Sequence, residues 1–267
     1  MRIDLKTISF VICALLLSLY LAIITFKSFL NINFWPAKNS SVKEKAMVTL
    51  SAEIPIIIYH YVEIVTDERD FIRKGLSITP ATFQSQIKTL KVKGYQTFFV
   101  RDIPGIIKGQ IRVNKKPVSL NFDDGYADFY SDVFPIIKKE NIKVTVYIVP
   151  QFIGHLNYMT KEQIYEIIAS GLVEIGSHTN WHVDLPSVSL ERAKAEIIDS
   201  KTFLDQEFKI KVETFCYPYG YYNETIANLV KSSSYTAAVS EVYGTTQSID
   251  NLYFLSRIRV GYFNTIF

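Results

Sequence analysis

Short apolar runs alternate with amphipathic segments along residues 54–260. Eight runs have the length and composition of buried strands, over residues 55–62, 95–100, 118–122, 144–149, 172–175, 212–216, 236–239 and 255–260. Apolar spacings of three and four, with capping residues, predict helices over residues 79–94, 102–108, 128–140, 161–170, 190–208 and 223–232. Strands that alternate with helices are typical of a parallel sheet, either open or closed into a barrel. We therefore predict an α/β domain over residues 54–267, with a surface loop over residues 66–74.

The N-terminal segment has a different pattern. Residues 8–26 form a nearly unbroken apolar run between Lys6 and Lys27. About twenty apolar residues suffice to cross a bilayer as a helix. The run is longer than a signal-peptide core and no Ala-x-Ala pattern follows it, which favours an uncleaved anchor over residues 1–30. A polar tether over residues 31–53 would then join a single-pass segment of the cell membrane to a domain outside the cytoplasm.

Composition narrows the possible partners. Hydrophobic residues make up 48% of the chain, enough for a core, and the aromatic content of 14% suits a surface that binds sugar rings. The net charge is only +3 and no long basic run occurs, so we expect no nucleic-acid partner. Cys13 lies in the apolar run and Cys216 in the domain, so we expect no disulfide.

Two adjacent carboxylates end one predicted strand, where Asp123-Asp124-Gly125 follows residues 118–122. Like charges repel, so the pair is costly unless a cation lies beside it. Downstream, His178 and His182 are four residues apart, which would place both imidazoles on one face of a helical turn. Asp124, His178 and His182 would supply three ligands and leave one position open, as in catalytic zinc sites. The alternatives are a capping Asp and two ordinary histidines at a helix start.

The predicted strand ends could form one catalytic site. In parallel α/β folds, active-site residues gather at the carboxyl ends of the strands. Asp123 cannot point the same way as its neighbour, so it is the candidate base for the attacking water. His60 ends an apolar strand and is the candidate acid for the leaving group, although a histidine in that position can also be a core residue. A backbone N–H near Tyr219 could stabilise the oxyanion.

Aromatic residues near these motifs are candidates for the walls of a pocket. Tyr217, Pro218 and Tyr219 follow a predicted strand, and Trp181 lies between the two histidines. The tyrosines could instead be core residues, and Trp181 could pack beneath the histidine loop.

Three motifs carry a resemblance to a known family. They are Asn121-Phe122-Asp123-Asp124-Gly125, Ser177-His178-Thr179-Asn180-Trp181-His182 and Tyr217-Pro218-Tyr219-Gly220. In this order they resemble the motifs of the NodB-homology polysaccharide deacetylases, carbohydrate esterase family 4. The resemblance covers residues 54–260, nearly all of the chain outside the predicted anchor and tether. The resemblance implies a distorted (β/α) barrel that removes acetyl groups from N-acetylated or O-acetylated sugars. It also implies that Asp123 is the base and that Asp124, His178 and His182 bind a divalent metal, Zn²⁺ first, with Co²⁺ or Ni²⁺ as alternatives.

The chain departs from the commonest family pattern at two positions. Cys216 occupies the place of an arginine in many members, and no histidine follows His182. The early Tyr59-His60 is similar to the permuted arrangement of the biofilm exopolysaccharide deacetylases of the IcaB and PgaB type, whose acid histidine comes from the first strand. Arg257 is the candidate for the missing cation beside Asp123, and Arg259, on the same face of the strand, is the alternative.

The resemblance implies a metal-dependent N-deacetylase of poly-β-1,6-N-acetylglucosamine, a biofilm exopolysaccharide. Its partners would be this polysaccharide, the membrane and the proteins of exopolysaccharide synthesis or export. Rival interpretations are a deacetylase of β-1,4 chains in peptidoglycan or chitin, an O-acetyl sugar esterase, and a catalytically silent carbohydrate-binding module.

Overall fold

The computed structural model of the protein describes residues 50–67, 69–263 and 267. The anchor predicted over residues 1–30 lies outside these ranges, as does most of the tether predicted over residues 31–53, so both stay predictions. Among the described residues, no helix has the length and apolar content that crossing a membrane would need.

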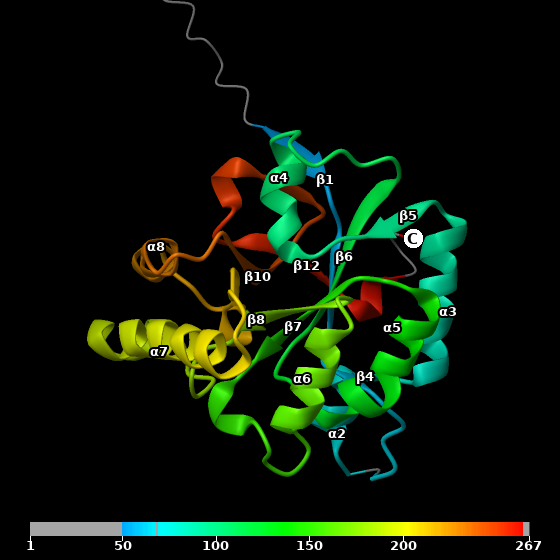
Figure 1. The fold of residues 1–267 in the computed structure, drawn as a ribbon, viewed down its shortest axis with the longest axis horizontal. Helices are drawn as coiled ribbons and strands as arrows, with labels where there is room; N and C mark the ends of the chain where they lie inside the picture. Colours follow the sequence, from blue (N-terminus) through cyan, green and yellow to red (C-terminus); the bar gives the residue numbers. More distant parts are fainter. Residues whose placement is uncertain (1–49, 68, 264–266) are drawn as a thin grey trace, which may run out of the picture. The chain divides into compact units, whose positions relative to one another are not determined.

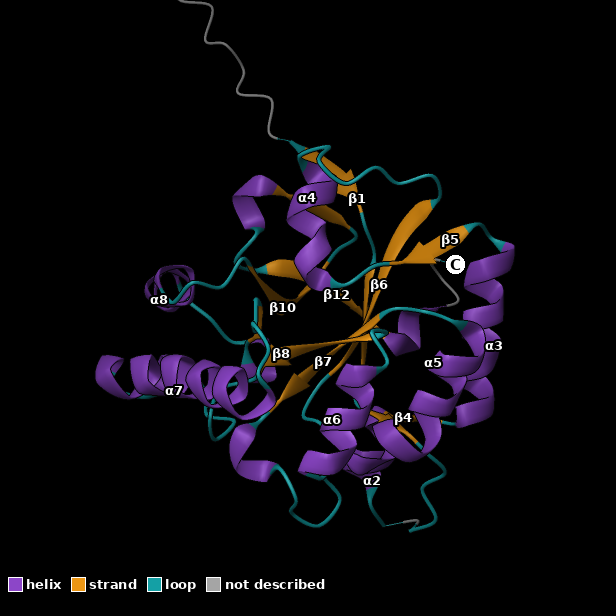
Figure 2. Cartoon of the chain, viewed as in Figure 1, coloured by secondary structure: helices purple, strands orange, loops and turns teal. Residues whose placement is uncertain are grey.

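Parallel strands form the centre of the described part of the chain (Figure 2). The main sheet has the order β2-β12-β10-β9-β8-β7-β6-β5, and β2 pairs with β6 as well. This additional pairing closes the sheet into a barrel of seven parallel strands and leaves β5 outside, against β6. The described strands are β1 Ser51–Glu53, β2 Ile56–Tyr59, β3 Tyr61–Val62, β4 Ser77–Ile78, β5 Tyr95–Thr97, β6 Lys116–Phe122, β7 Val144–Ile148, β8 Val173–Ser177, β9 Thr214–Cys216, β10 Ala237–Tyr243, β11 Thr246–Ser248 and β12 Leu255–Arg259.

Helices lie around the outside of the barrel (Figure 1). Polar side chains cap several of them: Thr79 accepts a hydrogen bond from the Thr82 N–H at the start of α3, and Ser189 and Asn223 cap α7 and α8 in the same way. The described α-helices are α2 Phe71–Leu76, α3 Pro80–Val92, α4 Ile103–Ile107, α5 Phe134–Glu140, α6 Lys161–Ala169, α7 Leu190–Phe208 and α8 Glu224–Ser232.

The alternation along β6 separates two environments. Val118, Leu120 and Phe122 belong to the apolar cluster between the strands and the outer helices. Ser119 and Asn121 alternate with them, are fully buried, and hydrogen bond to each other through their side chains. Because successive side chains of a strand point to opposite faces, the second set faces the barrel interior. The interior is therefore partly polar. A second apolar cluster extends from α4 to Cys216 at the end of β9.

Two expectations from the sequence are wrong in part. Within the predicted loop over residues 66–74, helix α2 begins at Phe71; none of its residues is buried, so the apolar pattern gives no signal for it. Strand β1 pairs antiparallel with β11, which places Ser51–Glu53 in the folded domain rather than in the tether.

Candidate active site

Three side chains converge at the carboxyl end of the barrel. Asp124 follows β6, and His178 and His182 follow β8. Asp124 Oδ1 lies 3.3 Å from His178 Nε2 and 3.2 Å from His182 Nε2. The structure thus brings together the three residues that the sequence predicts as metal ligands.

The histidine segment is a loop, which corrects the predicted helical turn. Thr179 and His182 have positive φ angles of 62° and 56°, and Asp124 has one of 73°. Non-glycine residues rarely adopt this left-handed conformation, which costs free energy and persists where the surroundings impose it. The two imidazoles therefore converge through a reversed backbone rather than through helical spacing.

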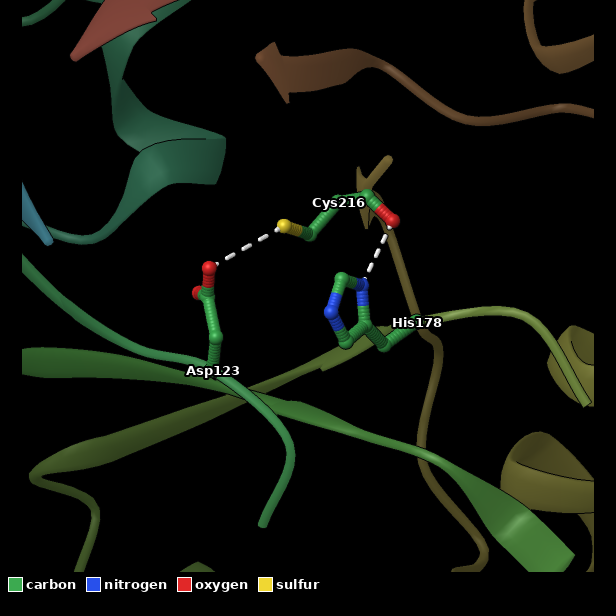
Figure 3. Close-up of side chains that lie close together, drawn as sticks. All are labelled: Asp123, His178 and Cys216. Carbon is green, nitrogen blue, oxygen red and sulfur yellow. Dashed lines mark hydrogen bonds between the residues drawn. The ribbon is translucent and has the colours of Figure 1, made fainter. Parts of the chain in front are cut away.

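The tautomer of His178 is set by a neighbouring strand. Its Nδ1 lies 2.7 Å from the carbonyl oxygen of Cys216 at the end of β9, and Figure 3 shows the ring pointing at this oxygen. A carbonyl only accepts, so Nδ1 carries the proton in this bond. The lone pair of Nε2 is then available, in the arrangement that metal-binding histidines commonly adopt.

The donor set fits a divalent cation of the zinc type. Ligands about 2.0–2.1 Å from Zn²⁺ at tetrahedral angles lie roughly 3.3–3.4 Å from one another, which matches the two distances to Asp124 Oδ1. Within the described residues, no hydrogen bond of good geometry reaches this buried oxygen. Burial opposes ionisation of Asp124, but the two imidazoles beside it, when they are protonated, hold its pKa well below the usual range. An ionised carboxylate with an unsatisfied buried oxygen favours a bound cation.

Asp123, the neighbour of Asp124 in the chain, pairs with Arg257. The guanidinium Nη1 and Nη2 lie 2.9 Å from Oδ1 and 2.9 Å from Oδ2 of the carboxylate, and both side chains are buried. Burial would raise the pKa of Asp123, but the charge and hydrogen bonds of Arg257 outweigh it and lower the pKa. Of the two arginines that the sequence offered as candidates, Arg257 therefore lies beside Asp123.

A bulge in β10 holds Arg257 in place. Val239 pairs with Leu255 and Tyr243 with Arg257, so the register shifts between these two pairs. In the irregular segment the Ser240 carbonyl accepts a hydrogen bond of 2.7 Å from Arg257 Nε. Bulges often lie next to active sites, where they re-aim groups.

Cys216 lies among charged groups. Its Sγ is 3.5 Å from Asp123 Oδ2, a contact drawn in Figure 3. The same sulfur is 3.2 Å from Arg257 Nη2. Burial raises the pKa of the thiol. The neutral S–H is therefore a weak donor to the Asp123 carboxylate.

A pocket of about 660 Å³ opens over these groups. Asp123, Asp124, both triad histidines, Tyr219 and His60 line it. His60 directly follows β2, so it reaches the pocket from the first strand of the barrel. The candidate base and the candidate acid therefore face one cavity.

The other predicted wall residues have different positions. Tyr217 is fully buried and its hydroxyl donates to the Tyr253 carbonyl at 2.7 Å, so it packs in the core. Pro218 is also buried, and neither it nor the exposed Trp181 lines the pocket. Tyr219 alone of the four lines the pocket, with a positive φ of 58° and its ring 4.7 Å from that of His182.

Glu196 is a positioning residue that the sequence did not reveal. It lies on α7, is 2% exposed, and accepts hydrogen bonds of 2.8 Å from the N–H groups of Asn180 and Trp181. Its carboxylate therefore holds the backbone between the two histidines. Its sequence context, a charged residue in a long amphipathic helix, is typical of a solvent-exposed position, so no local signal marks it.

The fold and the site define a (β/α)-barrel protein with a candidate cation site beside a buried carboxylate–arginine pair. The sequence model of the family described as polysaccharide deacetylase matches residues 110–238. YxkH of Bacillus subtilis (strain 168), named for this family, is 30% identical over 210 residues, which cover 79% of this chain and 72% of that protein. The chain therefore belongs to the polysaccharide deacetylase family, the NodB-homology enzymes of carbohydrate esterase family 4, which are hydrolases.

Other relatives agree with this assignment. The poly-beta-1,6-N-acetyl-D-glucosamine N-deacetylase of Staphylococcus aureus (strain MRSA252) is 27% identical over 249 residues, covering 85% of this chain and 82% of that protein. The Streptococcus pyogenes deacetylase PplD, solved in complex with acetate, superposes with a TM-score of 0.73 at 29% identity, over 78% of this chain and 92% of that one. IcaB from Ammonifex degensii shares the fold, with a TM-score of 0.69 at 21% identity over 80% and 95% of the two chains.

Proposed function

We propose that this protein is a metal-dependent N-deacetylase of N-acetylglucosamine polymers, and that poly-β-1,6-N-acetylglucosamine is its substrate. The observation that carries the proposal is the convergence of Asp123, His60 and the Asp124–His178–His182 triad on one pocket. The choice of linkage is supported by the resemblance to the staphylococcal poly-β-1,6-N-acetyl-D-glucosamine deacetylases and by the delivery of His60 from the first strand.

The residues of the pocket can carry the hydrolysis of an acetamide. A divalent cation held by Asp124, His178 and His182 would polarise the amide carbonyl and lower the pKa of the attacking water. Asp123 accepts a proton from that water as it adds to the carbonyl carbon. His60 then donates a proton to the nitrogen as the C–N bond breaks, which yields acetate and a glucosamine residue.

Acetate release tests the proposal directly. The purified protein is offered β-1,6-linked and β-1,4-linked N-acetylglucosamine oligomers with added Zn²⁺ or Co²⁺, and separately with a chelator. We expect metal-dependent release that favours the β-1,6 chain. Preference for the β-1,4 chain would move the substrate to peptidoglycan or chitin. Release from O-acetylated sugars alone would contradict the N-deacetylase assignment, and release from none of them would favour a binding module.

A substitution of Asp123 tests its assignment as the general base. Asp123→Asn should lower turnover by about 10²–10⁴-fold, the usual contribution of a general base, while the protein still binds one equivalent of Zn²⁺ through the triad. Activity that survives the substitution would show that another group is the base.

The acid assignment is tested by comparing leaving groups. An amine needs a proton to depart, whereas the nitrophenolate of 4-nitrophenyl acetate does not. His60→Ala should therefore reduce hydrolysis of the acetamide much more than hydrolysis of the ester. Equal losses on both substrates would show that His60 does not act as the leaving-group acid.

We also propose that residues 1–30 anchor the enzyme in the cell membrane, with the barrel outside the cytoplasm next to the proteins that make or export the glycan. The apolar run over residues 8–26 supports this placement. Protease added to intact cells should digest the barrel of an anchored enzyme, and recovery of the full-length protein in the soluble fraction would contradict the proposal.

A further inference from the structure

One ion pair in the pocket has no part in the chemistry above. Arg259 ends β12 and Glu241 lies on β10, and both line the pocket that contains Asp123 and His60. Arg259 Nη2 lies 2.5 Å from Glu241 Oε2. The carboxylate side chain is 17% exposed and the guanidinium side chain is 69% exposed, so the pair presents polar groups to whatever occupies the pocket.

The bulge of β10 positions Glu241. This residue belongs to the irregular segment between Val239 and Tyr243, where the register against β12 shifts. The turn after β9 packs directly against it: a Cβ on Gly220, whose φ is +70°, would lie 2.5 Å from the Glu241 Cβ and 2.7 Å from its N. A glycine is therefore required for this contact, and the turn that carries Tyr219 is fixed against the backbone of Glu241.

The location of the pair is next to the reacting groups. Arg259 pairs in register with Ile58 of β2, two residues before His60. Glu241 contacts the turn that presents Tyr219 over His182. Tyr221, whose ring is exposed, lines the same pocket. The pair therefore lies in the wall between the candidate acid and the aromatic turn.

The chemistry of this wall suits the hydroxyl groups of a neutral sugar. A carboxylate accepts hydrogen bonds, a guanidinium donates them, and each keeps further capacity after the single contact that joins them. The charges of the pair cancel, so it carries no net attraction for an ion. An exposed tyrosine ring adds an apolar face of the kind that a sugar ring can cover.

We propose that Glu241 and Arg259 bind the hydroxyl groups of the sugar next to the reacting acetamido group, with Tyr221 against the ring of that sugar, and so select a glycan over a simple acyl ester. This inference rests on the proposed function. It makes the two charged residues specificity determinants, distinct from the acid, the base and the triad.

The test compares two substrates in the full-length enzyme. Kinetic constants of Arg259→Ala, Glu241→Ala and Glu241→Gln are measured with an N-acetylglucosamine oligomer and with 4-nitrophenyl acetate, which carries no sugar. We expect kcat/KM for the oligomer to fall about tenfold in each alanine variant, the effect of one lost charged hydrogen bond, mostly through a higher KM. Glu241→Gln keeps an acceptor and should recover part of the loss. The loss on 4-nitrophenyl acetate should be much smaller.

A second ion pair provides the matched control. Lys211 and Glu213 lie before β9, away from the pocket, with side chains 73% and 24% exposed, close to the values for Arg259 and Glu241. Lys211→Ala should leave both substrates unaffected. Thermal melting of every variant establishes that it is folded.

The outcomes separate this inference from the proposed function. Equal losses on both substrates would overturn the inference, because the pair would then only support the bulge that holds Arg257. Oligomer kinetics unchanged in all variants would also overturn it, with the deacetylase assignment intact. If the loss in kcat/KM grew with the fraction of glucosamine in the oligomer, the pair would bind the ammonium groups of glucosamine, and the proposed binding of hydroxyl groups would be wrong. A wild-type enzyme that cleaves the ester and no glycan would overturn the proposed function as well.

Discussion

Two buried carboxylates inside the barrel have opposite electrostatic surroundings. Asp123, after β6, accepts two hydrogen bonds from Arg257, and its pKa lies below the usual value although burial would raise it. Glu174, on β8, accepts hydrogen bonds from the hydroxyls of Thr145 at 2.7 Å and Thr214 at 3.1 Å. Burial raises the pKa of Glu174 to about 7, and these hydroxyls, together with the charge and the backbone N–H of Arg101, only partly offset it.

The difference shows which interaction sets the charge of an interior carboxylate. Burial penalises the anion at both positions, but only Asp123 has a bidentate cation in contact. Neutral hydroxyls donate hydrogen bonds to the oxygens of Glu174 but do not neutralise its negative charge. The barrel thus keeps Asp123 anionic, as its proposed role as the base requires, and leaves Glu174 readily protonated.

The largest expected effect comes from removing the cation. Arg257→Met leaves the buried Asp123 carboxylate unpaired and should lower the free energy of unfolding by about 3–5 kcal/mol. Denaturant unfolding at pH 7 measures this change. Combining it with Asp123→Asn removes both charges and should recover much of the loss. If Arg257→Met alone were as stable as the wild type, the ion pair would not determine the ionisation of Asp123.

Glu174 should give the next largest effect, with a defined pH dependence. The folded protein keeps a proton on Glu174 that the unfolded chain releases between its ordinary pKa of 4.5 and about 7, so the free energy of unfolding falls as pH rises through this window. The glutamine of Glu174→Gln stays neutral at every pH. The variant should therefore lack this fall in the free energy of unfolding, which amounts to roughly 3 kcal/mol in the wild type. Denaturant unfolding from pH 4 to 8 should show the variant gaining stability over the wild type as pH rises.

A surface substitution is the control for that pH dependence. Glu213→Gln, at an exposed ion pair, should follow the wild-type stability curve. If Glu174→Gln followed it too, the pKa of Glu174 would be the same in the folded and the unfolded protein, and the comparison with Asp123 would fail.

A third buried carboxylate, Glu196, should have the smallest effect. It contacts backbone N–H groups and Arg192, whose Nη2 lies 2.5 Å from its Oε1. Glu196→Gln keeps one acceptor oxygen but weakens the hold on the loop between His178 and His182. We expect Zn²⁺ affinity to fall about 10-fold, as for other residues that orient metal ligands. Competition with a chromogenic chelator measures it, and an unchanged affinity would show that the loop is fixed by other contacts.

The periodicity of apolar residues in the sequence predicted most of the strands of the barrel. In strands such as β6, one face packs against the helices, so apolar residues alternate with other residues along the sequence. The periodicity could not predict that β2 inserts between β12 and β6, since apolar alternation marks a strand but not its neighbours. It also placed Arg257 and Arg259 on one face without distinguishing them. The depth of the two arginines in the barrel distinguishes them. Arg257 lies inside the barrel against Asp123, and Arg259 lies at the mouth of the barrel against Glu241.

Long-range contacts explain what the site prediction missed. The convergence of His178 and His182 depends on residues that adopt the left-handed backbone conformation but are not glycines. No residue type in the sequence therefore indicates it. Glu241 enters the pocket through a bulge, which shifts the alternation on which the prediction of faces depends. Tyr217 was a plausible wall residue by its place after β9, but its hydroxyl has a partner in the core.

The insertion of β2 between β12 and β6 has a consequence for how the enzyme matures. Ile57 pairs with Leu120 on one side and with Ile258 on the other, near the opposite end of the domain. Pairings this distant in sequence form slowly, because a long loop must close before they stabilise anything. The triad comes from β6 and β8, whereas Arg257 arrives only with the last strand. We therefore expect a chain emerging from synthesis to assemble the Asp124–His178–His182 triad early and to gain activity late, which refolding followed in parallel by Zn²⁺ uptake and acetate release can resolve.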